Sequence, residues 1–556
     1  MSNKFLKQLR RYLLPGLSLA FLYFVGSQFY FRLDLTADQR YSLHTATKKL
    51  LSELDEVLHI DIYLTGELPT DLKQLKRATQ ELLEECKVHA GHPIRYRFVD
   101  LDKATKEEKK NHYKQLASQG IQPTNLYLQE KGQRIEKLIF PGALLTYKGR
   151  TGGMLLLKGN KMTSPAQMVN QSIEGLEYEF AQTINQLVRT KRKQIAVLRG
   201  HQEPDLKYLN GLLNALAAHY RVQTPKLSAK TDLSGYDALL ITRPQRPFSE
   251  SEKYVLDQYI MQGGKVLFFL DRLRTNMENL HRQVDFAFPL ELGLEDQLFK
   301  YGVRINPDLV QDLRSGAYPV VVGNLGNQPQ IQLLPWPFFP ILNLFADHLV
   351  TKNMDALYPQ FVSSIDKIQV PDVTHTPLVF TSQYARRTAA PVQVDLETLR
   401  KAPQPAHYNH GHLPLAYLLE GRFTSLYKNR FLPEGFDETH FLPDSRPTKL
   451  LVVASGSLVR NSIDARKKQL LPWGYDPFLR QQFANKDFVL NALAYMLDEG
   501  GLIQLKQKNR AIRLLDNVKI NKERLGWQLI NLITPLLLLG MLGILWNYLY
   551  RRAYQK

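Results

Sequence analysis

Cysteine is almost absent from this 556-residue chain, which contains only Cys86. A single thiol cannot form a disulfide within the chain, and a zinc site built from several cysteines is excluded. The first predicted strand, HIDIYLT, runs into LTGELP, without the Cys-x-x-Cys that a thiol oxidoreductase needs. Cys86 is therefore expected to be an ordinary residue on one face of a helix.

The signature motifs of nucleotide and acyl chemistry are also missing. There is no G-x-x-x-x-G-K-[ST] loop, because the nearest segment, QGGKV, lacks both the spacing and the hydroxyl. There is no G-x-S-x-G elbow, and no G-x-G-x-x-G follows a strand. Zinc-finger spacing, RNP-like segments and basic heptads are absent, so nucleic acid is not expected as a partner. We predict a chain that is not an enzyme and needs no cofactor.

Charge is missing from two long apolar segments, one near each end of the chain. Residues 12–31 and 525–550 contain no Asp, Glu, Lys or Arg. Each is long enough to cross the hydrocarbon core of a bilayer, about 30 Å, as a helix of about 20 residues. The exit from the first segment, SQFYFRLDL, lacks a small-x-small cleavage site, so a cleaved signal peptide is not expected. We predict transmembrane helices at 12–31 and 525–550.

The charges outside these segments predict the orientation in the membrane. Both tails, 1–11 and 551–556, carry Lys and Arg but neither Asp nor Glu. Positively charged flanks stay in the cytoplasm, so both tails are expected there and the body on the other side of the membrane. The whole chain has a net charge of +19, and the two tails hold seven of its Lys and Arg, so the body is basic as well, at +12. It favours anionic lipid headgroups, an anionic polymer or an acidic partner, unless the charge only serves solubility.

The first part of the body, residues 32–190, is predicted to be a small α/β domain. HIDIYLT and IRYRFVDLD have the composition of strands, and a helical pattern follows each of them. The order β-α-β-α-β-β resembles a thioredoxin-like domain. Ahead of it, Ser42 can cap a helix with Leu43, Leu50 and Leu54 on one face. That helix is either a membrane-proximal amphipathic helix or the first helix of an ordinary domain.

Residues 191–271 and 448–500 are predicted to form a second, doubly wound α/β domain. The strands QIAVLRG, YDALLITRP and KVLFFLD alternate with helices, and KLLVVASGSLV and NKDFVLNALAYMLDE supply the last pair. Continuous apolar strands of this kind are typical of a parallel sheet covered on both faces. The domain resembles the amidotransferase and flavodoxin-like group, but the only cysteine lies in another domain, so amidotransferase chemistry is not supported.

Two segments of the body remain outside these two domains. Residues 272–447, rich in proline and aromatic side chains, form an insertion or a third domain, and residues 501–524 link the body to the second span. Within the insertion, Trp336, Phe338 and Phe339 are expected to pack in a core or a domain interface. Ser249 and Glu252 have the spacing of a capping box at the start of a helix.

Three groups of residues are candidates for a site. His201 and Glu203 in RGHQEP stand at the carboxyl end of a predicted parallel strand, where doubly wound folds bind ligands. Two alternatives are open: the pair binds a ligand there, or it only holds the loop in its conformation. His407, His410 and His412 in AHYNHGH are weak candidates for sharing a transition metal, or they lie on a solvated loop. The backbone of SGSLVRN could cradle an anion, or it is only a turn.

Strings spread along the whole chain resemble the gliding-motility-associated ABC-transporter auxiliary (GldG) family of the Bacteroidota. They are FRLDLTADQRYSLHTATKKLL, IYLTGELP, LRGHQEP, LPLAYLLEGRF, DFVLNALAYMLD and DNVKINKERLGWQLINLITPLLLL. None of them is a catalytic motif. The resemblance implies a bacterial inner-membrane component with a periplasmic body, which works with a separate ABC permease and a separate cytoplasmic ATPase.

Two other functions remain open at this point. One is a membrane-tethered enzyme that acts on an envelope substrate through His201 and Glu203. The other is a static scaffold of the envelope that needs no ATPase. The auxiliary subunit of an ABC-type complex is the leading hypothesis, because the chain has two predicted membrane anchors but neither a P-loop nor a complete set of catalytic residues.

Overall fold

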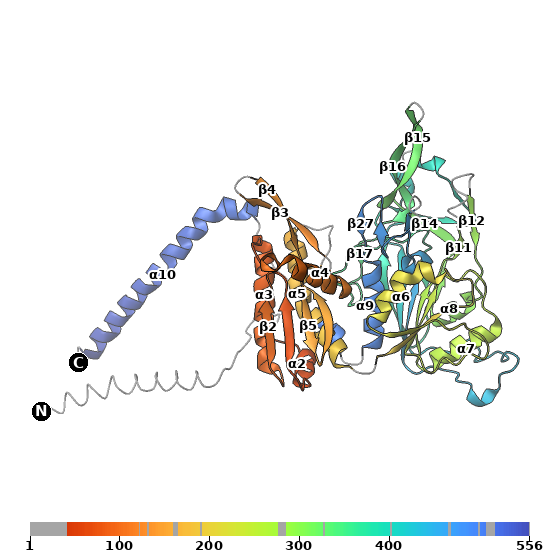
Figure 1. Ribbon diagram of the computed structural model, residues 1–556, viewed down its shortest axis with the longest axis horizontal. Coiled ribbons are helices and arrows are strands. Elements are labelled where there is room, and N and C mark those ends of the chain that lie inside the picture. Colours follow the sequence, from red (N-terminus) through yellow and green to blue (C-terminus); the bar gives the residue numbers. More distant parts are fainter. Residues whose placement is uncertain are drawn as a thin grey trace. The chain divides into compact units, whose positions relative to one another are not determined.

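The chain is described by a computed structural model, shown in Figure 1. It describes residues 42–121, 123–130, 133–158, 165–189, 192–275, 285–325, 328–400, 403–464, 469–498, 501–507 and 517–554. These residues belong to two units, Met1–Lys508 and Asn509–Lys556. The predicted first span, 12–31, lies outside the described residues. The first unit contains an N-terminal lobe, 42–189, and a larger lobe, 192–498. Residues 501–507 pack in the core of the N-terminal lobe through Ile503 and Leu505.

The N-terminal lobe is built on a four-stranded sheet in the order β2-β1-β5-β6. Strands β1 and β2 are parallel, β5 is antiparallel to β1, and β6 is antiparallel to β5. Leucines of α3 and α5 share one core with β1, whereas Leu116 of α4 packs in a second cluster with Tyr63 and Phe140. The elements are α2 (Thr45–Ser52), β1 (Leu58–Ile62), α3 (Thr70–His89), β2 (Ile94–Phe98), α4 (Lys106–Ser118), β3 (Thr124–Glu130), β4 (Gln133–Ile139), β5 (Gly142–Tyr147), β6 (Arg150–Leu155) and α5 (Pro165–Val188).

The predicted N-cap at Ser42 is wrong, because the cap of α2 is His44. The Nδ1 atom of His44 accepts a hydrogen bond from the backbone N–H of Ala46 at 3.2 Å. This ring satisfies one of the free N–H groups of the first turn, as a cap must. Leu50 and Leu51 are buried in the core of the lobe with α3 and α5. The helix is therefore the first helix of a domain.

The larger lobe contains an eight-stranded sheet in the order β17-β19-β22-β23-β10-β9-β7-β8. The five strands from β23 to β8 run parallel to one another, and the pairs β22–β23, β19–β22 and β17–β19 are antiparallel. The strands are β7 (Gln194–Leu198), β8 (Arg221–Gln223), β9 (Ala238–Thr242), β10 (Lys265–Phe269), β17 (Leu344–Phe345), β19 (Val373–Phe380), β22 (Pro414–Gly421) and β23 (Thr448–Val453).

Helices cover both faces of this sheet. Leu267 and Phe269 of β10 share a core with the helices α6 (Asn210–Ala217) and α9 (Asn485–Leu497). The alternate residues, Val266 and Phe268, share a different core with α7 (Glu250–Met261) and α8 (Glu295–Tyr301). Successive side chains of a strand point to opposite faces, so the continuous apolar sequence of β10 is explained by burial on both. The predicted capping box of Ser249 and Glu252 is confirmed at α7.

The segment expected as an insertion, 272–447, contributes three strands to the same sheet. Strand β22, formed by the string PLAYLLEG, lies between β19 and β23. The remaining short elements are β11 (Leu273–Arg274), β12 (Asp285–Pro289), β13 (Val303–Ile305), β14 (Asp308–Asp312), β15 (Ser315–Leu325), β16 (Gln328–Pro340), β18 (Ile365–Lys367), β20 (Ala385–Ala389), β21 (Val392–Val394), β24 (Ile463–Asp464), β25 (Gln469–Leu470), β26 (Tyr475–Asp476), β27 (Gln481–Gln482) and the 3-10 helix η8 (Leu502–Gln507).

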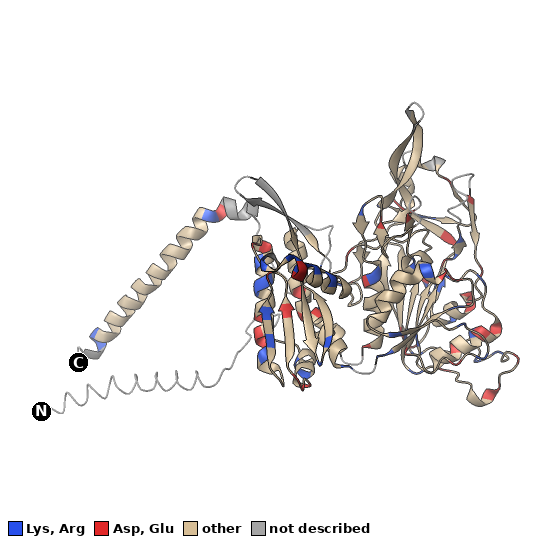
Figure 2. Ribbon diagram, in the orientation of Figure 1, with Lys and Arg blue, Asp and Glu red and all other residues tan. Residues whose placement is uncertain are grey.

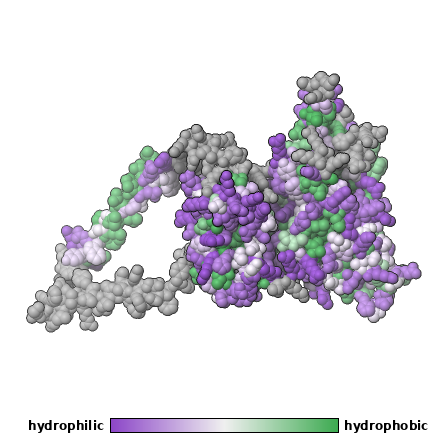
Figure 3. All heavy atoms as spheres, in the orientation of Figure 1, coloured by the Kyte–Doolittle hydropathy of each residue, from purple (hydrophilic) through white to green (hydrophobic). Residues whose placement is uncertain are grey.

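The second unit is the helix α10 (Asn517–Tyr554). Within it, Glu523–Arg552 is long and apolar enough to cross a membrane, and none of its apolar window is buried. Among the described residues this is the one helix that meets those criteria. Its middle is apolar, and basic residues stand at its C-terminal end (Figures 2 and 3). The helix can serve as a membrane anchor, and it includes the span predicted at 525–550.

Cys86 gives a first testable prediction. Its side chain is fully buried on α3, and burial raises the pKa of the thiol well above its usual value. A buried neutral thiol is a poor nucleophile. We expect no labelling of the native chain by N-ethylmaleimide and full labelling in guanidinium chloride, as measured by intact mass. A Phe431→Cys variant is the control, because Phe431 is 100% exposed. Equal labelling rates of the native wild type and the new thiol would contradict the prediction.

Candidate functional site

The carboxyl ends of the parallel strands are where a doubly wound sheet binds ligands. His201 and Glu203 lie there, in the loop after β7. The chain passes from β8 at one edge to β9 on the other side of β7, so this loop stands at the point where the strand order reverses. Both residues therefore lie at the carboxyl end of a parallel strand, as the sequence predicted. Both side chains are nearly inaccessible, at 4% and 2% exposure.

The contacts of His201 and Glu203 are within the protein. The backbone N–H groups of Gly200 and His201 both donate to Oε2 of Glu203, each at 3.0 Å. The His201 ring stacks on Phe248 with centroids 3.7 Å apart. Its Nε2 lies 3.3 Å from Oε2 of Glu252, and its Nδ1 lies 3.7 Å from Oε1 of Glu203. This geometry is that of a pair that structures the loop.

The electrostatics of this loop favour a charged imidazole. Burial opposes the charge, but the contacts with the carboxylates of Glu203 and Glu252 outweigh it and raise the pKa of His201. Burial also acts to raise the pKa values of Glu203 and Glu252. The contacts with His201 and with nearby backbone N–H groups outweigh burial, so both pKa values are lowered. These pKa shifts favour an ion triad in which one imidazolium lies between two carboxylates.

A pH-dependent stability follows for His201→Gln. The folded-state pKa is raised, so the stabilisation by the charged ring is fully present below the unfolded pKa of about 6.5. It is lost as the pH rises through the folded-state pKa. We expect the loss of unfolding free energy in the variant to be larger at pH 5.5 than at pH 9, as measured by urea denaturation. His440→Gln, at an exposed position, is the control. A difference that stays constant or grows with pH would contradict this assignment.

A second cluster closes the same edge of the sheet between β9, β10 and β23. Arg243 follows β9, and its Nε lies 2.5 Å from Oδ2 of Asp271, which follows β10. The other oxygen of Asp271 accepts the backbone N–H of Gly456 at 2.6 Å. A Cβ atom at position 456 would lie 2.4 Å from Cγ of Arg243, so glycine is required there. The backbone of SGSLVRN therefore does bind an anion, but the anion is the carboxylate of Asp271.

Arg243 and Asp271 were not among the site residues predicted from the sequence. The available signal was their position, because each is the first charged residue after a buried apolar strand. A charged residue directly after such a strand lies at the carboxyl edge of the sheet. Beyond Asp271 this edge opens into a cavity of about 520 Å³ between α8 and the segment 426–430. This cavity was also not predicted.

His407, His410 and His412 are exposed on a loop. His410 and His412 are fixed through their backbone N–H groups, which donate to the carbonyl oxygens of Ala385 and Ser382. In the part of the chain that the structure describes, no three His, Cys, Asp or Glu side chains are close enough to hold a metal ion. The sequence spacing therefore does not bring these imidazoles together as a ligand set.

Comparisons with known proteins give the family. Residues 192–492 match the family described as an ABC-type uncharacterized transport system, and residues 37–146 match a domain of unknown function, DUF7088. An uncharacterized protein of Borreliella burgdorferi is 21% identical over 440 residues, covering 75% of this chain and 78% of that protein. A solved structure titled mmIFT52 N-terminal domain aligns with 55% of this chain and 97% of its own, at 12% identity and a TM-score of 0.32.

The first match spans just over half of the chain and coincides with the larger lobe. It contains the eight-stranded sheet, the loop of His201 and the cluster around Asp271. The second match falls on the N-terminal lobe. The chain therefore belongs to the ABC-type transport system auxiliary family.

Proposed function

We propose that this chain is a non-enzymatic extracytoplasmic subunit of an ABC-transporter-type complex associated with gliding motility. A separate permease and a separate cytoplasmic ATPase would be its partners. The observation that carries the proposal is the family match over 192–492 in a chain that ends in the apolar helix Glu523–Arg552. The carboxyl edge of the large sheet supports a role without catalysis, because His201, Glu203, Arg243 and Asp271 all lie in ion pairs within the protein.

We also propose the membrane arrangement and the fold of the N-terminal lobe. Residues 12–31 would be a second span, with both tails in the cytoplasm and the body in the periplasm of a bacterial inner membrane. The N-terminal lobe would be thioredoxin-like. The parallel β1-α3-β2 unit, the antiparallel pair β5 and β6 on the other side of β1, and the helices α3 and α5 sharing one core support this.

The test of the function is a pull-down from native membranes in mild detergent. We expect the tagged full chain to bring down a polytopic permease and a P-loop ATPase in a fixed ratio, as measured by quantitative mass spectrometry. His201→Gln is the matched variant, and it should recover the same partners because its contacts are internal. Recovery of neither partner would contradict the proposal and favour a static scaffold. ATP hydrolysis by the purified chain alone would contradict it as well.

The topology can be tested with single cysteines in a Cys86→Ala background. Phe431→Cys reports on the body, and Lys4→Cys and Lys556→Cys report on the two tails. We expect a membrane-impermeant maleimide to label position 431 in spheroplasts and to label both tails only after lysis. Labelling of position 4 in intact spheroplasts would contradict a first span at 12–31, and labelling of position 556 would contradict a cytoplasmic C-terminus.

A further inference from the structure

The cavity beside the carboxyl end of β10 has the dimensions of a ligand site. Its volume of about 520 Å³ lies within the usual range for pockets that hold small molecules. The walls are mainly apolar and include Leu270, Leu292, Leu298, Phe299 and Leu426. Phe299 is 50% exposed at α8, although a large apolar side chain gains from burial. The cavity can therefore bury an apolar group.

The acidic side chains around the cavity are all neutralised within the protein. Asp271 is paired with Arg243. Glu295 accepts a hydrogen bond from Arg272 at 2.8 Å and one from the backbone N–H of Leu292 at 3.0 Å.

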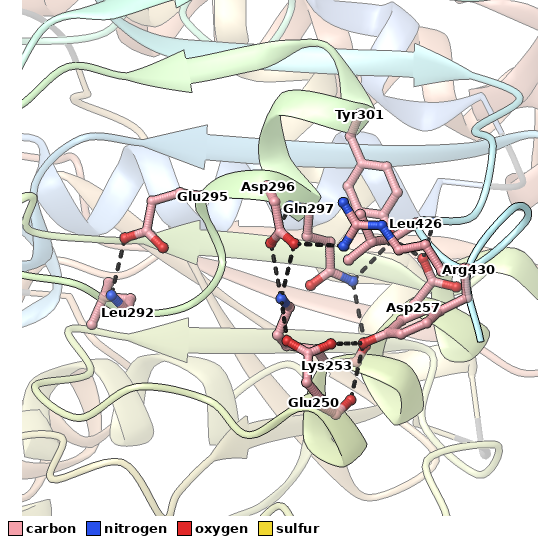
Figure 4. A network of polar contacts seen from close by, with 11 residues as sticks. Glu250, Lys253, Asp257, Leu292, Glu295, Asp296, Gln297, Tyr301, Leu426 and Arg430 are labelled. Carbon is pink, nitrogen blue, oxygen red and sulfur yellow. Dashed lines mark hydrogen bonds and ion pairs between the residues drawn. The ribbon is translucent and has the colours of Figure 1, made fainter. Parts of the chain in front are cut away.

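Asp296 is held between two cations, as Figure 4 shows. The Nζ atom of Lys253 lies 2.9 Å from one oxygen of Asp296, and a nitrogen of Arg430 lies 3.0 Å from the other. Lys253 also pairs with Glu250 at 2.9 Å. Because these carboxylates are already paired with cations of the protein, they do not favour the binding of a cationic ligand.

Two further cations line the cavity. Lys300, near the end of α8, and Arg304, on β13, are both exposed. No ion pair within 4 Å is formed by either of them among the described residues, although Asp366 stands opposite Arg304 on β18 and the charge of Lys300 helps to lower the pKa of Asp444. An apolar cavity with two cations at its rim is complementary to an anion with an apolar body.

We propose that this cavity binds an amphipathic organic anion, with its apolar part against Leu298 and Phe299 and its anionic group at Lys300 and Arg304. The same chemistry occurs in the headgroup and chain of an anionic lipid and in a free organic acid. The proposal does not depend on the proposed function, because a ligand-binding lobe and a subunit that binds a permease are separate properties.

The test uses the full chain in nanodiscs of zwitterionic phosphatidylcholine. The probe is 4-benzoylbenzoate, a photoreactive aromatic carboxylate, and the neutral control is 4-benzoylbenzamide. We expect saturable crosslinking by the carboxylate, with crosslinked peptides mapped by mass spectrometry to 292–307 and 426–430. Equal labelling by the neutral amide, or crosslinks spread over the surface, would overturn the proposal and show that the probe binds without specificity.

A charge-reversal variant tests the role of the two cations. Lys300→Glu with Arg304→Glu should weaken the apparent affinity about tenfold or more, because the anion then meets like charge. The matched control is Arg221→Glu with Lys230→Glu, which changes the net charge equally at exposed positions that do not line the cavity. Circular dichroism checks that both variants fold. An unchanged affinity in the first variant, or an equal loss in both, would overturn the proposal.

Competition separates the two sources of the ligand. Displacement of the probe by a lysophosphatidate supports a lipid headgroup, and displacement by decanoate alone supports a free organic acid. Failure of both to compete would overturn the proposal. Recovery of the permease and the ATPase by the charge-reversal variant is measured in parallel. If the probe does not bind but the permease and the ATPase are recovered, the ligand proposal fails and the proposed function stands. If the probe binds but neither partner is recovered, the proposed function fails and the ligand proposal stands.

Discussion

Asp257→Ala is expected to reduce the free energy of unfolding by about 3–5 kcal/mol, the range for leaving buried charged or polar partners without their contact. Asp257 is fully buried on α7 and accepts four hydrogen bonds. The hydroxyls of Tyr301 and Ser425 donate at 2.7 Å each, and the backbone N–H of Leu426 and the side chain of Gln258 donate at 3.0 Å each. Alanine would leave these donors without an acceptor and would release the segment 425–430 from α7.

The measurement is urea unfolding of the full chain in detergent, followed by tryptophan fluorescence. Asp257→Asn should be much milder, because its carbonyl oxygen can still accept from Tyr301 and Leu426. Burial raises the pKa of Asp257 despite these hydrogen bonds, so removing the charge itself costs little. Asp205→Ala is the control, because Asp205 is exposed and its change should stay within about 0.5 kcal/mol. A loss for Asp257→Ala no larger than that of Asp205→Ala would contradict the structural role.

Trp336→Ala is expected to reduce the free energy of unfolding by a similar amount, about 3–5 kcal/mol, because it removes a large buried ring. Trp336 is 1% exposed on β16. Its ring centroid lies 4.5 Å from that of Phe339, 4.8 Å from that of Tyr318 and 5.6 Å from that of Phe361. The cavity left behind would loosen the base of the β15–β16 hairpin.

Hydrogen exchange monitored by mass spectrometry can locate this effect. We expect faster exchange in 315–325 and 328–340, together with a lower midpoint of urea unfolding. Trp336→Phe keeps an aromatic ring and should lose less than half as much. Phe431→Ala, at a position that is 100% exposed, should change neither quantity. Unchanged exchange in the hairpin of Trp336→Ala would show that the aromatic cluster does not hold it.

Local patterns in the sequence were sufficient for many elements. The continuous apolar strands of the large sheet, the capping box at Ser249 and the apolar run within α10 each depend on residues that are close in sequence. Trp336 was predicted to pack in a core or a domain interface, because aromatic and proline residues follow it in WPFFP, and the structure places it in a core. The N-cap of α2 shows the limit of such patterns, since His44 and Ser42 both offer an acceptor and only the folded backbone decides between them.

Features that join distant segments were decided only by the tertiary structure. The sequence placed His201 and Glu203 at the carboxyl edge of the sheet, but it could not show that Glu252, about 50 residues away, completes their ion triad. Asp271 and Gly456 are 185 positions apart, and they meet because β10 and β23 are neighbours in the sheet. Likewise, β17, β19 and β22 join that sheet from a segment that looked like an insertion.

The physical reason is the range of each signal. By itself, the sequence determined where the chain forms strands and helices and where it is apolar enough to enter a membrane, because periodicity and hydropathy are properties of neighbouring residues. It did not determine which strands lie side by side, since strand order depends on the packing of the whole lobe. The cluster around Asp271 and the cavity lined by Lys300 and Arg304 follow from that order, and therefore only the tertiary structure reveals them.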